Sequence, residues 1–483
     1  MAKNLMNTSD KSNFILNMTE EQYSKAASLG IIAACLSVSL FTIPPEISKE
    51  MTYSSSTFGL VIPGVFCMIM ALIAIIRKFI AGKAIFSACA FGAMIGWGAV
   101  SMLDSYDINI GFYGFPQRGE GLLAIIFYCC FFITAASLKH QKALKSVING
   151  IILAGIANSA FAMIQIFTGE FTHYPPLLTN LDFAASGLSQ SPIFLAMTLT
   201  LALIAAMVSS ALTSSGKYRI FCLASSCIFI FTMIYTFSLM SLVGIALAVI
   251  FTIAAAVIRK SPKKALLLMI LPAASGALAL VLCFAGIGSK SSSYKLLDGK
   301  TLWTFDSYSR ISSSGLYDDR AVDINDTFDV YYFLNTKTID IIKESPMTGT
   351  GPEQLVYPQL YTVKSPTGEE LKSVTDIISN NAGTFDKVYN EYLYTTATRG
   401  IPSLLALLCI LIPVLCLGFR NTKIAVEPEN AVLFFITLGG ALIFLIGCSN
   451  ITFAPIFWAA AGASCVCLEK KKLPEKKKTE SNS

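Results

Sequence analysis

The chain has 483 residues, of which 54% are hydrophobic and only 14% are charged. Soluble domains carry about 25% charged residues, so this composition excludes an ordinary soluble globular protein. The formal net charge of +6 does not indicate nucleic-acid binding, because the basic residues lie in short clusters between apolar runs and in a final "EKKKLPEKKK".

Apolar runs of about 20 residues recur along the chain and predict an all-α polytopic membrane protein with about 12 transmembrane helices. The predicted spans are 26–44, 57–76, 84–103, 121–138, 146–167, 191–212, 219–237, 239–258, 265–287, 400–419, 430–448 and 453–468. They divide the chain into a cytoplasmic N-terminus (1–25), nine transmembrane helices (26–288), a large external loop (289–399), three more transmembrane helices (400–468) and a basic cytoplasmic tail (469–483). No cleavable signal peptide is expected, since the first apolar run begins only near Ala26.

The basic residues of the connections set the expected orientation. Lysine and arginine are concentrated in the connections 77–83, 139–145, 214–219, 259–264 and 420–423, which are alternate loops, and again in the tail. The positive-inside rule therefore predicts a multi-pass protein of the cytoplasmic (inner or plasma) membrane with both termini in the cytoplasm. All 13 cysteines lie in apolar runs and form no CxxC pair, so neither a zinc site nor a disulfide framework is indicated.

One external loop is far longer than the others and is rich in aromatic residues, which predicts a folded segment rather than a simple connector. Its middle, "TFDVYYFLNTKTIDIIKESP", predicts a helix that stops at Pro346, followed by the glycine-rich turn "MTGTGPEQL". A second helix is expected from Thr384 or Asp386 toward Gly400, which would place Lys387 and the glutamate four residues later one turn apart as an ion pair.

The ionisable residues gather at the external ends of the spans and are almost absent within them. Ion-coupled transporters usually need such residues inside the bilayer, so the pattern favours chemistry at the outer membrane boundary. External arginines suit a phosphate-bearing ligand, because the guanidinium fork matches phosphate oxygens. His173 is the only external histidine and a candidate base. The tyrosines near residue 390 also fit a plain amphipathic helix at the membrane interface, and a transporter or flippase stays open.

Four stretches occur in the order and topology of a known family. They are "GFYGFPQRGEGLLAIIFY" before the fourth span, "ASGLSQSPIFLAMTLTLAL" at the sixth, "TIDIIKESPMTGTGPEQL" in the large loop, and "DKVYNEYLYTTATRGIPSLLALL" at its end. Taken together they resemble the O-antigen ligase and O-antigen polymerase superfamily of bacterial membrane glycosyltransferases. The resemblance covers most of the chain.

The resemblance implies a multi-span, GT-C-like enzyme that transfers a glycan from a polyprenyl-diphosphate carrier to an acceptor hydroxyl at the outer membrane face. No metal and no other cofactor is implied. The expected partners are the carrier-linked oligosaccharide (undecaprenyl diphosphate), a glycan or lipid acceptor, membrane lipids, and a flippase and chain-length partner, with no nucleic acid. The implied site consists of Tyr389, Asn390 and Glu391 as catalytic candidates and Arg118, Glu120, His173, Arg310, Arg320 and Arg399 as substrate-binding candidates.

The sequence departs from the family pattern at three positions. Tyr389 stands where the family has a histidine, Leu239 stands where an arginine is frequent, and Val330 begins a stretch in which another arginine is common. A tyrosine has a reference pKa near 10 and is a poor base at neutral pH. Glu391 or His173 could act instead, and a catalytically inactive member of a glycan-assembly complex remains an alternative.

Overall fold

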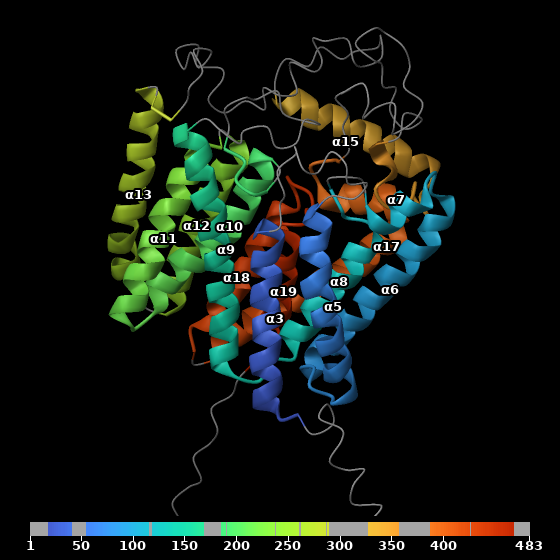
Figure 1. Ribbon diagram of the computed structural model, residues 1–483, viewed down its shortest axis with the longest axis horizontal. Coiled ribbons are helices and arrows are strands. Elements are labelled where there is room, and N and C mark those ends of the chain that lie inside the picture. The colour runs from blue at the N-terminus through green and yellow to red at the C-terminus, as the bar shows by residue number, and fades with distance from the viewer. Residues whose placement is uncertain are drawn as a thin grey trace, which may run out of the picture.

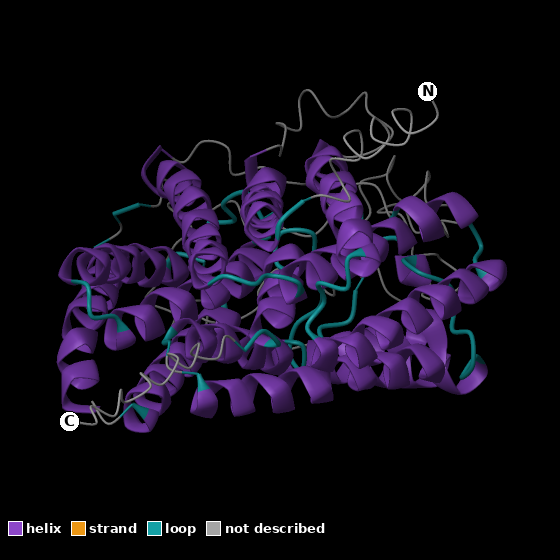
Figure 2. Ribbon diagram, turned by 90° about the horizontal axis from the view of Figure 1, so that it is seen from below, coloured by secondary structure: helices purple, strands orange, loops and turns teal. Residues whose placement is uncertain are grey.

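The computed structural model describes residues 18–40, 55–114, 118–168, 185–189, 191–236, 238–259, 262–285, 287–288, 327–356, 387–425 and 427–467. All regular elements within these ranges are helices, joined by short loops and turns (Figure 2). The principal helices are α3 (Glu20–Leu40), α5 (Ser55–Ile76), α6 (Ile85–Ser101), α7 (Ile108–Tyr113), α8 (Leu122–Ala136), α9 (Gln141–Thr168), α10 (Pro192–Leu212), α11 (Gly216–Ile234), α12 (Leu239–Ile258), α13 (Pro262–Phe284), α15 (Thr327–Glu344), α17 (Glu391–Ile424), α18 (Glu429–Ile443) and α19 (Ala454–Ser464).

Each predicted span overlaps one of these helices, which confirms the all-helical class. Among the described residues, eight helices are long and apolar enough to cross a membrane, and α8 and α18 are shorter apolar helices. The predicted total of about 12 spans, the external placement of the large loop and the proposed domain limits stay predictions.

The bundle is built around α10, whose membrane-length stretch is wholly buried in the protein. It packs against α9, α11, α12 and α18, while α6 packs on α17 and α8 packs on α5 and α19. Helices at the periphery, notably α5 and α13, expose many large apolar side chains. A soluble monomer rarely exposes so much apolar surface, whereas a bilayer covers it.

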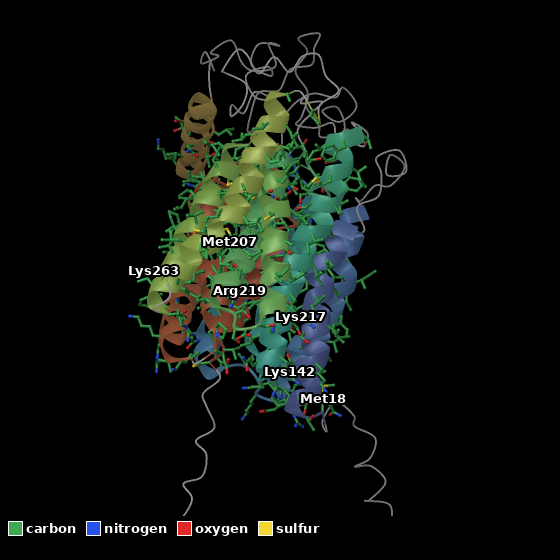
Figure 3. The ribbon with its side chains drawn as sticks, turned by 90° about the vertical axis from the view of Figure 1, so that its left-hand side faces the viewer. Met18, Lys142, Met207, Lys217, Arg219 and Lys263 are labelled. Carbon is green, nitrogen blue, oxygen red and sulfur yellow. The ribbon has the colours of Figure 1, made fainter. Side chains whose placement is uncertain are left out.

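The two ends of the bundle differ in character. The basic connections meet at one end, where the Arg77 guanidinium donates to the Met18 carbonyl and that of Arg259 to the Glu427 carbonyl. Met18 and Lys142 lie at this end (Figure 3), whereas α15 lies across the opposite one (Figure 1). The end that carries α15 is the one predicted to be external, and this orientation stays a prediction.

Helix α17 is broken at Gly400, which has φ 76° and ψ 171°. A Cβ atom at this position would lie 1.8 Å from the carbonyl oxygen of Met347, so the glycine lets two backbones touch. The break frees carbonyls of α17, and the amides of Thr350 and Gly351 donate to those of Ala397 and Thr398 at 3.0 and 2.9 Å. The glycine-rich turn after α15 is thereby fixed against α17.

The structure confirms one prediction for the large loop and corrects another. As expected, helix α15 ends at Glu344, just before Pro346, and a turn follows it. Within this turn Gly349 and Gly351 have positive φ. The second helix, however, begins at Glu391 and not near residue 384 or 386, since residues 387–390 are not helical. Residues 384 and 386 themselves lie outside the described part of the chain. The Asn390 side chain caps the N-terminus of α17 by accepting a hydrogen bond from the Leu393 amide, so the helix begins at the next residue.

Candidate active site

Five segments that are distant in sequence meet beneath α15. They are the loop before α8, the turn after α15, the residues preceding α17, the first turns of α17 and the loop between α18 and α19. The charged side chains that they bring together are Glu120, Glu353, Lys387, Glu391 and Arg399, each at most 7% exposed. Buried charges of this kind are retained only when they are paired and hydrogen-bonded.

Lys387 is the centre of one ion-pair group. Its ammonium pairs closely with Glu120 Oε2, lies 3.4 Å from Glu353 Oε1 and donates to the Ser449 carbonyl at 3.0 Å. Burial alone would lower the pKa of this ammonium, but the carboxylates of Glu120 and Glu353 outweigh it and raise the pKa above its usual value. Lys387 is therefore a cation at neutral pH, and it ties the turn after α15 to the loop before α8.

Glu391 and Arg399 form a second group on the first two turns of α17. Glu391 Oε1 accepts from the Thr395 hydroxyl at 3.0 Å and lies 3.6 Å from an Arg399 nitrogen, and Oε2 accepts from the Ser449 amide at 2.8 Å. Arg399 also donates to the Thr395 hydroxyl at 2.8 Å. The spacing of four residues places all three side chains on one helix face.

Two tyrosine hydroxyls and one serine complete the network. Tyr128 on α8 and Ser449 donate to Glu120 Oε1 at 2.9 and 2.8 Å. Tyr394 on α17 donates to Glu353 Oε1 at 2.6 Å. Since three glutamates face one lysine and one arginine, the cluster carries one excess negative charge when every group is ionised.

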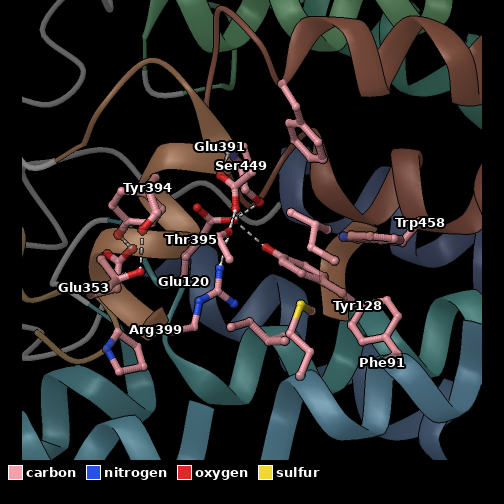
Figure 4. A pocket seen from close by; sticks show the side chains of 16 residues that line it. Phe91, Glu120, Tyr128, Glu353, Glu391, Tyr394, Thr395, Arg399, Ser449 and Trp458 are labelled. Carbon is pink, nitrogen blue, oxygen red and sulfur yellow. Dashed lines mark hydrogen bonds and ion pairs between the residues drawn. The ribbon is translucent and has the colours of Figure 1, made fainter. Parts of the chain in front are cut away.

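A cavity opens between these groups (Figure 4). Its volume is about 40 Å³, room for a few water molecules, since one water needs about 10–15 Å³ of such space. Its lining combines carboxylates, hydroxyls and Arg399 with apolar side chains that include Phe91, Leu407 and Trp458. Phe91 and Trp458 lie on the side away from Glu353 and Tyr394 (Figure 4). The cavity can thus hold a reacting group against charged side chains but not a whole sugar ring.

Residues 224–408 match a family model described as O-Antigen ligase. This match supports membership of the O-antigen ligase and polymerase superfamily. At a coarse level the match also supports a function of the O-antigen ligase or polymerase type, a glycosyltransferase-like enzyme class and a lipid-linked oligosaccharide as the general kind of substrate. None of the curated proteins compared with the chain matches it.

The O-antigen ligase match spans less than half of the chain, yet it contains much of the cavity. Glu353, Lys387, Glu391 and Arg399 lie within it, whereas Glu120, Tyr128 and Ser449 lie outside. Segments outside the match therefore complete the site, namely α8 with the loop before it and the loop before α19.

The structure brings together three of the sequence-predicted site residues, since Glu120, Glu391 and Arg399 all line the cavity. Tyr389 and Arg118 are buried nearby but are not among the lining residues. The Arg118 guanidinium lies 5.1 Å from the ring of Phe194. Burial raises the pKa of the Tyr389 hydroxyl well above its usual value, although the charge of Arg118 works in the opposite direction. Their assigned roles in the O-antigen ligase reaction stay predictions.

The remaining candidates divide into two groups. Asn390 is the N-cap of α17, which is a structural role that its position explains. His173, Arg310 and Arg320 lie outside the described residues.

Sequence reasoning missed several cavity residues of this superfamily member. The predicted pairing of Lys387 with Glu391 is wrong, because α17 begins only at Glu391 and Lys387 pairs with Glu120 and Glu353. Glu353 lies inside the glycine-rich turn that the sequence analysis singled out, so this turn was an available signal. Nothing local distinguishes Tyr128 within an apolar helix or Ser449 within a short loop.

Proposed function

We propose that the protein is a cell-surface polysaccharide polymerase or ligase that transfers a glycan from a polyprenyl-diphosphate carrier to an acceptor hydroxyl. The observation that supports this most is the buried, charged cavity at the end of the bundle beneath α15, to which the family-matched segment contributes half of the lining residues. With about 12 spans and cytoplasmic termini, this end lies at the outer membrane face, where a carrier lipid would present its diphosphate.

Arg399 is suited to the leaving diphosphate. A guanidinium has five N–H donors, and among the described residues its only hydrogen bond goes to Thr395. Its remaining donors are at the edge of the cavity, where Glu391 and Thr395 fix the side chain in advance. A donor held in place before the reaction stabilises the negative charge that builds up as the bond to the diphosphate breaks. We propose that side chains alone perform the transfer, as the resemblance implies.

The acceptor hydroxyl must lose a proton as its oxygen attacks the anomeric carbon, so a general base is needed within reach. Glu391 and Glu353 are the carboxylates on the α17 side of the cavity that could serve. Tyr389 is a poor choice, since its hydroxyl is buried outside the cavity and holds its proton more tightly than usual.

The shape of the cavity favours an enzyme over a transporter or flippase. A transport path needs a polar passage that continues across the bilayer. Within the described residues the cavity measures only about 40 Å³, which is small for such a passage, and its lining includes the apolar side chains of Phe91, Leu407 and Trp458. An inactive scaffold is disfavoured as well, because a scaffold has no need for several buried ion pairs around an open space.

The test is glycan transfer by the purified protein in lipid nanodiscs, using undecaprenyl-diphosphate oligosaccharide and a glycan acceptor. Arg399→Gln should lower turnover by about 100-fold or more, the usual effect of removing one transition-state donor. Arg399→Lys keeps the charge that pairs with Glu391 and should retain partial activity. Arg420→Gln, an exposed arginine later in α17, is the matched control and should behave as wild type.

Two outcomes would reject the proposal. One is a wild-type protein that transfers no glycan but moves the carrier-linked oligosaccharide across a liposome membrane, which would establish the flippase alternative. The other is an unchanged surface polysaccharide profile after deletion of the gene.

A further inference from the structure

The three glutamates at the cavity differ in how fully their oxygens are used. Glu120 Oε1 accepts from two hydroxyls, and its Oε2 is paired with Lys387. Glu391 Oε1 accepts from Thr395 beside Arg399, and its Oε2 accepts from the Ser449 amide. Both carboxylates therefore hold their neighbours in place with both oxygens, which leaves little freedom for a proton-transfer role.

Glu353 is the exception. Its Oε1 accepts from the Tyr394 hydroxyl and lies 3.4 Å from Lys387, whereas no described residue is a partner of its Oε2. The Glu353 side chain is only 3% exposed. Even so, among the described residues, Oε2 does not belong to the fully buried polar atoms that lack a hydrogen bond. Glu353 lines the cavity, so a carboxylate oxygen that no described residue occupies is available to a group bound there.

The backbone that carries Glu353 is unusual as well. It has φ 59°, a conformation that few residues other than glycine adopt and that persists only when the surroundings enforce it. The surroundings do so here, because the turn is fixed to α17 through the amides of Thr350 and Gly351. The carboxylate is thereby held in one position at the cavity, which a general base requires.

We propose that Glu353 is the general base of the transfer, an inference that rests on the proposed function. In this step, the acceptor oxygen forms a bond to the anomeric carbon while the bond from that carbon to the carrier diphosphate breaks. The electron pair of the broken bond leaves with the diphosphate, and the acceptor proton moves to Glu353 Oε2. Glu353 later releases this proton to water, which restores the site.

The neighbours of Glu353 support this role. The ammonium of Lys387 stands 3.4 Å from Oε1, and the Tyr394 hydroxyl donates to the same oxygen and orients the group. Lys387 and Tyr394 are positioning residues in this scheme, since both contact the oxygen opposite to the one that takes the proton.

The first experiment compares Glu353→Gln with wild type in the nanodisc transfer assay. Glutamine keeps the size of the side chain and its bond to Tyr394 but cannot take a proton. Turnover should fall by about 100-fold or more, the usual contribution of a general base, with little change in the KM for the carrier-linked donor. The acid limb of the pH profile should disappear. Glu344→Gln, which removes an exposed glutamate of α15, is the matched control.

The second experiment separates catalysis from a structural role. Glu353→Ala leaves space for a small carboxylate, so added formate should raise its turnover in a saturable way and should not affect Glu344→Gln. Turnover of Glu353→Gln within about three-fold of the control would overturn the assignment. A loss of turnover that formate does not restore, accompanied by a lower unfolding temperature, would also overturn it. If wild type itself transfers no glycan, the proposed function fails; if only the Glu353 results fail, that function stands with another base.

Discussion

The contact between the glycine-rich turn and Gly400 can be tested by adding a single methyl group. In Gly400→Ala the new Cβ would lie 1.8 Å from the Met347 carbonyl oxygen, whereas ordinary contact begins at 3.4 Å, so one backbone must move by about 1.6 Å. Three hydrogen bonds cross this contact, from Thr350, Gly351 and Ile401, and each contributes about 1 kcal/mol. The positive φ adds about 1–3 kcal/mol of strain, so we expect a destabilisation of about 5 kcal/mol.

The measurement is the apparent unfolding temperature of the purified protein in detergent at one fixed scan rate. Gly400→Ala should lower it by at least about 5 °C and should speed hydrogen exchange at the turn amides. Gly96→Ala is the matched control, because a Cβ at Gly96 in α6 meets nothing within 4 Å and alanine favours a helix. Equal unfolding temperatures for the two variants would refute the described packing of the turn on α17.

Two further predictions concern the residues just before α17. Lys387→Met leaves the buried carboxylates of Glu120 and Glu353 without their cation, so it should lower the free energy of unfolding by about 3–5 kcal/mol. Because the folded protein raises the pKa of Lys387, the stabilisation is complete below the usual lysine pKa and is lost only as the pH rises through the higher folded value. Unfolding curves should therefore show a constant difference between this variant and wild type from about pH 7 to pH 9, and a difference that shrinks there would contradict the pairing. Asn390→Ala removes the cap of the Leu393 amide and should lower stability by about 1 kcal/mol in the same assay, whereas Asn390→Asp should not.

The helical bundle could be predicted because a bilayer imposes a length and a composition on every span. The same is true of the glycine-rich turn, since glycines at positions 349, 351 and 400 mark places where only a backbone without a side chain fits. The start of α17 was predicted less accurately than these features. Helix propensity allows an earlier start, but α17 begins only at Glu391, because Asn390 caps its N-terminus and Lys387 is buried against other segments.

The pairing within the site was beyond reach of the sequence for a different reason. Lys387 and Glu120 are 267 residues apart, and nothing in their local surroundings links them. A local rule for i,i+4 pairs selected Glu391 as the partner of Lys387, and the tertiary fold overrode it. Arg399 directly precedes the span predicted from residue 400, at the proposed outer boundary, and it lines the cavity.

The departure at Tyr389 and the role proposed for Glu353 have a common physical basis. A phenol at the position of the family histidine could act as a base only if its pKa fell toward neutrality, and burial moves it in the opposite direction. On the proposed function, a chain with this tyrosine needs a base from another residue at the cavity. The turn after α15 reaches it because Gly349, Gly351 and Gly400 allow backbone contact with α17, and Glu353 follows directly on that contact. On this basis, restoring a histidine at position 389 should not rescue Glu353→Gln, because an imidazole there would be buried outside the cavity.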